Sequence, residues 1–148
     1  LYEWRMNLAT GATSERPLDD VNTEFPMIHP GQLGRQNRYS YNTLLPFEIP
    51  ATFDGVVKYD LERGSSETIY YGAGIFGSEA PFAPRPGATS EDDGYLITFV
   101  TDASNWSSAC WIYHAANLQD GPIAKVALPH RLPAGFHATW VDARDMAA

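Results

Sequence analysis

The chain has 148 residues, a mass of 16.4 kDa and 44% hydrophobic residues, which suits one modest packed domain and argues against disorder. Its net charge of -8 at pH 7 disfavours nucleic acid and anionic membrane as partners, because both repel an acidic surface. The single cysteine, Cys110, excludes an intrachain disulfide and is typical of a reducing compartment such as the cytoplasm.

Alternating, aromatic-rich or nearly continuous apolar runs predict short β-strands along most of the chain. The first run covers residues 1–8, and further runs lie at 38–42, 55–61, 68–71, 95–100, 109–113 and 123–128. Runs 55–61 and 68–71 flank a short polar loop and predict a hairpin. The acidic residues 91–93 lack the pattern of an EF-hand calcium loop, so we expect a solvated turn there.

No segment keeps a 3.6-residue period over three turns, so helix content should be low. Short strands with frequent turns are typical of a sandwich, barrel or propeller. The chain begins at Leu1, without a methionine and inside an alternating run. We therefore interpret it as part of a longer protein.

The segment 122–140 places His137 shortly after Pro133, Ala134 and Gly135. Proline fixes φ and glycine permits dihedrals closed to other residues, so a turn here is expected to aim the imidazole in a set direction. Metal binding needs such aiming, but one histidine does not make a metal site. On residue type alone, a histidine satisfied in a core or loop is the more common case.

The other histidines, His29, His114 and His130, are expected to lie at the surface or in a second layer. Cys110 lies in an apolar strand run, where an inert buried thiol is the default. A nucleophile elbow, a phosphate loop, a CxxC pair and an HExxH helix are all absent from the sequence.

Four collinear segments carry the most specific pattern. They are EFPMI at 24–28 with RQNRYSY at 35–41, GSEAPFAPR at 77–85, EDDGYLITFV at 91–100, and NLQDGPIAKV at 117–126 running on to FHATW at 136–140. In this order they resemble the C-terminal part of the carotenoid cleavage oxygenase family, which includes lignostilbene dioxygenases and retinoid isomerohydrolases.

The resemblance implies an all-β fold, namely about two blades at the C-terminal end of a seven-bladed β-propeller. Residues 1–148 would form the C-terminal part of a single propeller domain. It also implies one Fe(II) ion held by four histidines, three of which donate hydrogen bonds to glutamates. His137 matches the final iron ligand, and Glu24 and Glu79 match two of those glutamates by their EFP and GxE contexts. The other three ligands are expected outside this chain.

The resemblance further implies an apolar substrate tunnel, for which Phe136 beside the ligand is a candidate lining residue. Most other aromatics are expected to be propeller core: Phe25, Tyr39, Tyr41, Phe76, Phe82 and Trp140.

The implied function is Fe(II)-dependent cleavage of a conjugated C=C bond by O2, in a carotenoid, apocarotenoid or stilbene, giving two carbonyl products. The 148 residues alone are expected to be inactive and poorly stable, because most ligands and neighbouring blades are missing. Two alternatives stay open: a non-catalytic β-propeller or sandwich binding module, and a retinoid-type isomerohydrolase with the same iron centre. We expect a cytoplasmic protein, or a plastid one if its source is a plant, with membrane contact only through parts outside this chain.

Overall fold

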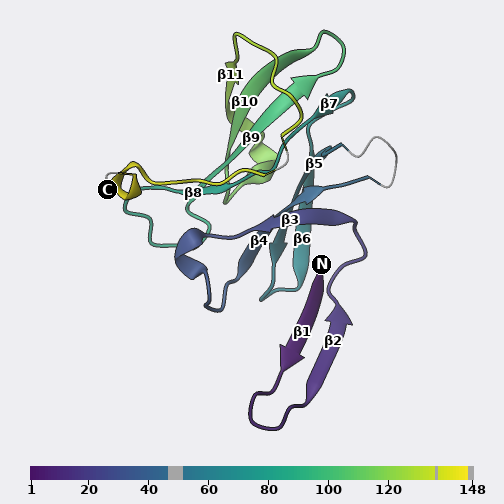
Figure 1. Cartoon of the computed structure of the whole chain (residues 1–148), viewed down its shortest axis with the longest axis vertical. Helices are drawn as coiled ribbons and strands as arrows, with labels where there is room; N and C mark the ends of the chain where they lie inside the picture. Colours follow the sequence, from purple (N-terminus) through teal and green to yellow (C-terminus); the bar gives the residue numbers. More distant parts are fainter. Residues whose placement is uncertain (47–51, 136, 147–148) are drawn as a thin grey trace.

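The described residues form three antiparallel β-sheets. The computed structural model describes residues 1–46, 52–135 and 137–146. The first sheet is a hairpin that projects from the lower end of the molecule in Figure 1; its strands are β1 (Tyr2–Met6) and β2 (Thr13–Pro17). The expected all-β class is confirmed.

The second sheet is a meander whose strands pair in sequence order: β3 (Thr23–Met27), β4 (Tyr39–Leu44), β5 (Gly55–Asp60) and β6 (Ser65–Tyr70). The third sheet has the order β11 (Pro122–Ala127), β10 (Ser107–His114), β9 (Gly94–Asp102) and β7 (Ile75–Phe76), and β8 (Phe82–Pro84) also pairs with β9. Three short 3₁₀ turns complete the described elements: η1 (Pro30–Gln32), η2 (Leu118–Asp120) and η3 (Ala143–Asp145). Over the described ranges, no helix has the length and apolar character needed to cross a bilayer.

Strands that contain an apolar or aromatic run were predicted, whereas short or fully exposed strands were missed. The predicted hairpin is β5–β6, in which Asp60 lies opposite Ser65. Nothing in the sequence indicates β2, because its residues TSERP are all exposed and it buries no apolar side chain. β3 contains Pro26, and β7 and β8 have only 2 and 3 residues, so none of the three shows a usable period.

The hydrophobic core lies between the second and third sheets. Tyr41 and Val56 come from the second sheet, Leu96 and Trp111 come from the third, and all four are buried. Burying each such side chain stabilises the fold by about 1.5–3 kcal/mol. Gly55 allows the close approach of β5 and β6, because a Cβ there would lie 1.9 Å from the carbonyl oxygen of Ile69.

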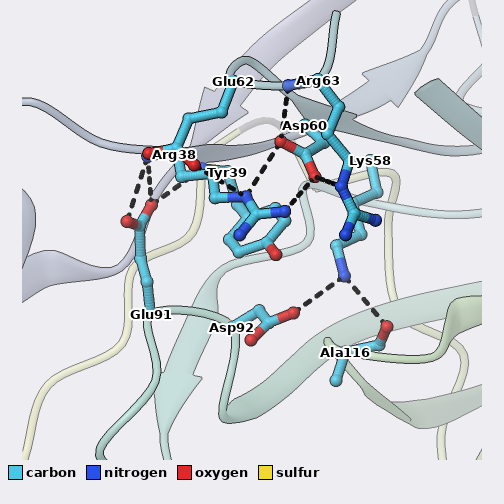
Figure 2. A network of polar contacts seen from close by, with 9 residues as sticks. All are labelled: Arg38, Tyr39, Lys58, Asp60, Glu62, Arg63, Glu91, Asp92 and Ala116. Carbon is cyan, nitrogen blue, oxygen red and sulfur yellow. Dashed lines mark hydrogen bonds and ion pairs between the residues drawn. The ribbon is translucent and has the colours of Figure 1, made fainter. Parts of the chain in front are cut away.

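A polar network joins the two larger sheets around the turn at 91–93 (Figure 2). The Glu91 carboxylate accepts hydrogen bonds from the backbone N–H groups of Arg38 and Tyr39, at 2.8 Å for the shorter contact in each case. Lys58 Nζ donates to Asp92 Oδ2 at 3.2 Å and to the Ala116 carbonyl at 2.9 Å. We call the contacts of Lys58, Glu91 and Asp92 the inter-sheet clasp.

The expectation of a purely solvated turn at 91–93 is therefore wrong. Glu91 and Asp92 are half-buried because the turn packs against the second sheet, where backbone donors and the Lys58 ammonium compensate their charges.

Candidate functional site

The segment after β11 carries His137 back along the third sheet. Residues 131–135 have no assigned helix, strand or turn, and the Leu132 N–H donates to Ser108 Oγ at 3.0 Å. Gly135 does not have a positive φ, and a Cβ there would lie 3.6 Å from Ser78 Cβ. The expected turn at 133–135 is thus wrong, and a hydrogen bond to the third sheet holds the segment instead. The direction of His137 must come from side-chain contacts.

Glu79, in the connection between β7 and β8, supplies the principal contact. Its Oε1 lies 3.0 Å from His137 Nδ1, and its Oε2 accepts a hydrogen bond from the Ala138 N–H. The Glu79 side chain is 4% exposed, whereas that of His137 is 72% exposed. A buried carboxylate therefore contacts and orients an accessible imidazole.

This contact selects one tautomer of the imidazole. An ionised carboxylate can only accept, so the proton of a neutral His137 lies on Nδ1 and the lone pair lies on Nε2. Carboxylate support of this kind fixes the orientation of metal-binding histidines and makes them more basic. The donor chemistry of His137 and Glu79 thus fits one corner of a metal site.

His137 lies on the wall of an apolar cavity of about 850 Å³. The lining is mostly hydrophobic and draws on the second sheet, the third sheet and the segment that carries His137; it includes Phe25, Leu45, Phe53, Phe76 and Trp106. The Phe25 ring makes a T-shaped contact with the imidazole, with ring centroids 5.1 Å apart. The cavity suits an apolar ligand beside a single histidine.

Glu24 lines the same cavity but does not reach His137. It lies in β3, its side chain is exposed, and its backbone carbonyl accepts a hydrogen bond from Thr43 Oγ1 at 2.9 Å. Its carboxylate makes no hydrogen bond with any other residue in the described ranges. Of the two predicted glutamates, only Glu79 is brought into contact with the predicted ligand.

The aromatic predictions divide in two. Tyr41 and Phe82 are in the core as expected, whereas Phe25 and Phe76 line the cavity and Trp140 is exposed. Phe53 and Trp106 were not singled out, and their aromatic character was the only available signal. Phe136 lies outside the described residues, so its place along a tunnel stays a prediction.

The other histidines do not line this cavity. His29 Nδ1 accepts from the Gly31 N–H at the start of η1, His114 stacks on Tyr95, and His130 is exposed. Within the described ranges there is no cluster of three or more His, Cys, Asp or Glu side chains that could hold a metal. Any metal at His137 needs ligands from outside these residues.

The family model described as retinal pigment epithelial membrane protein (RPE65) matches residues 1–142. The chain is 39% identical to carotenoid 9,10(9',10')-cleavage dioxygenase 1 of Arabidopsis thaliana, covering 95% of this chain and 28% of that protein. It is 33% identical to the probable carotenoid cleavage dioxygenase 4, chloroplastic, of the same plant, covering 96% of this chain and 25% of that protein.

Among solved structures, the chain is similar to a mutant of Synechocystis apocarotenoid oxygenase, with a TM-score of 0.88 and 28% identity over 96% of this chain and 30% of that one. A cobalt-substituted form of the Synechocystis protein gives a TM-score of 0.81 at 28% identity, over 90% of this chain and 29% of that one. The three sheets are therefore part of a seven-bladed β-propeller, as expected. The chain spans between 25% and 30% of the length of these proteins.

Proposed function

This chain belongs to the family of retinal pigment epithelial membrane protein and the carotenoid cleavage dioxygenases, and from that membership we propose that it forms part of an Fe(II)-dependent dioxygenase. The whole enzyme, meaning this chain at the length of its relatives, would cleave a conjugated C=C bond with O2. Residues 1–148 would then be the C-terminal part of one propeller domain, inactive by themselves. One observation carries the proposal: buried Glu79 holds the imidazole of His137 on the wall of an apolar cavity.

In this proposal His137 binds the iron through Nε2, and Glu79 keeps the proton on Nδ1. When bound, the iron supplies the site at which O2 is bound and activated. Glu24, exposed on the same cavity, would accept the N–H of a second histidine that lies outside the described residues. The similarity to a cobalt-substituted structure supports a metal site in the whole enzyme.

The substrate class follows from the cavity. Its rings and aliphatic side chains offer little hydrogen bonding, which favours an extended hydrocarbon over a polar metabolite. We propose a carotenoid or apocarotenoid ahead of a stilbene, because the similar proteins are named for carotenoid and apocarotenoid substrates. Phe136, next to His137, would extend the apolar lining. A plastid or the cytoplasm would be its location, in keeping with a chloroplastic relative.

The test compares two histidine variants of the whole enzyme. His137→Ala is expected to lose bound iron and carotenoid cleavage together. His114→Ala, which removes a histidine stacked on Tyr95 away from the cavity, is the matched control and should retain both. Retained iron and retained cleavage in His137→Ala would overturn the proposal. With isotopically labelled O2, cleavage places the label in carbonyl products, whereas isomerohydrolysis leaves the alkene uncleaved and without that label.

A further inference from the structure

Phe25 has a backbone conformation that is rare for an aromatic residue. Its φ is 50°, in the left-handed region that bulky side chains seldom adopt. It lies where the pairing of β3 with β4 shifts register between Glu24 and Met27, which marks a β-bulge. The next residue, Pro26, has no N–H to donate to the ladder. Retention of such a conformation points to a use for the side chain it places.

The bulge brings two consecutive side chains to one cavity. In a regular strand, successive side chains point to opposite faces of the sheet. Glu24 and Phe25 nevertheless both line the 850 Å³ cavity that His137 lines. The left-handed residue thus turns the Phe25 ring to the side that Glu24 already faces.

The Phe25 ring makes T-shaped contacts with two other rings, those of His137 and Phe53. Its centroid lies 5.1 Å from that of His137 and 5.4 Å from that of Phe53, with an interplanar angle of 82° in both pairs. These values fall within the favourable range for T-shaped pairs. Phe53 therefore contacts Phe25, and Phe25 in turn contacts the imidazole.

We propose that Phe25 is a positioning residue for His137. The hydrogen bond from Nδ1 to Glu79 fixes one atom of the imidazole, and the T-shaped contact with Phe25 fixes the plane of the ring. Together they set the direction of Nε2. This inference rests on the proposed role of His137 as a metal ligand.

The experiment uses the whole enzyme loaded with Co(II), whose visible absorption reports ligand geometry. Affinity is measured by competition with a chelator. Phe25→Leu is expected to weaken Co(II) affinity roughly 10-fold, at the lower end of the range for groups that orient metal ligands, and to alter the Co(II) spectrum. Phe25→Tyr keeps the ring and should restore both. Phe76→Leu removes another ring of the same cavity that makes no ring contact with His137, and should leave both unchanged.

His137→Ala separates the two hypotheses. If it leaves Co(II) affinity unchanged, the metal-ligand proposal fails. If His137→Ala weakens Co(II) affinity, the positioning role of Phe25 alone can still fail, in either of two ways. In the first, folded Phe25→Leu keeps the wild-type affinity and spectrum; in the second, Phe76→Leu changes both as much as Phe25→Leu does. Should Phe25→Leu not accumulate as folded protein, Phe53→Leu replaces it. Loss of the Phe53 ring, which contacts Phe25, should change the Co(II) spectrum in the direction expected for Phe25→Leu but by a smaller amount. An unchanged spectrum would refute the role of Phe25.

Discussion

In the inter-sheet clasp, we expect the loss of the Asp92 charge to lower the free energy of unfolding more than the loss of Lys58. The Lys58 side chain is 9% exposed and that of Asp92 is 18% exposed, with 3.2 Å between Nζ and Oδ2. At an effective dielectric constant of about 20, their Coulomb attraction is about 5 kcal/mol, before the cost of desolvation is subtracted. Asp92→Asn leaves the buried ammonium with the Ala116 carbonyl, the Tyr39 ring and a neutral amide. We expect it to destabilise the local fold by about 2–3 kcal/mol.

Lys58→Met removes the buried charge itself. The more exposed Asp92 and Ala116 can then hydrate, so the expected cost is smaller, about 1–2 kcal/mol, for the two lost hydrogen bonds. The double variant contains no uncompensated buried charge and should cost little more than Lys58→Met alone. This non-additivity is the signature of a coupled pair.

Hydrogen exchange of the β5 and β9 amides in the whole enzyme measures these local free energies of opening. The control is Arg85→Gln, which breaks the neighbouring ion pair with Asp93, where the arginine side chain is 51% exposed. Because solvent screens this exposed pair, that variant should change the free energy of opening much less than either clasp variant. Additive costs, or a Lys58→Met variant more costly than Asp92→Asn, would refute the reasoning.

Three further predictions concern metal binding, packing and pH. Glu79→Gln, measured by chelator competition, should weaken metal affinity about 10–100-fold, because an amide can no longer offer two accepting oxygens; unchanged affinity would count against Glu79 as the orienting group. Gly94→Ala should destabilise the protein by about 1–3 kcal/mol, seen as a lower unfolding midpoint, because a Cβ would lie 2.5 Å from a Phe82 ring carbon and 2.6 Å from a backbone oxygen. Hydrogen bonds from Arg38 lower the pKa of Asp60 to about 2. A depressed carboxyl pKa stabilises the fold above the unfolded-state pKa, so this stabilisation is lost as the pH falls from about 4 to about 2. Arg38→Gln should flatten acid destabilisation in that window, and an acid-unfolding profile identical to wild type would contradict it.

Local structure could be predicted where the pattern of apolar side chains indicates which residues are buried. Apolar alternation predicted β5, a nearly continuous apolar run predicted β9, and the polar loop between two runs predicted the β5–β6 hairpin. The sequence could not predict the burial of Lys58. The groups that compensate its charge, Asp92 and the Ala116 carbonyl, lie 34 and 58 residues further along the chain. The same holds for the turn at 91–93, whose acidic residues look solvated until the second sheet packs against them.

The site was predicted through family motifs and not through spacing. Glu79 and His137 lie 58 residues apart, and no periodicity joins them. Their contact agrees with the resemblance, while their roles at a metal and that of Glu24 stay predictions. The contact of Phe25 with His137 could not have been predicted from residue type. It depends on a left-handed φ at Phe25, which the letters EFP do not indicate. The turn expected at Gly135 is wrong, and the role of His137 as a ligand stays a prediction.

The candidate site draws on parts of the chain that meet only through packing of the two larger sheets. Phe25 comes from β3 of the second sheet, whereas Glu79 comes from the β7–β8 connection and His137 from the segment docked on the third sheet. A shift between the sheets would therefore move the ring contact relative to the hydrogen bond while leaving each strand pairing intact. The clasp at Lys58 joins the same two sheets, so we expect a variant that loosens it to alter the geometry of His137 as well.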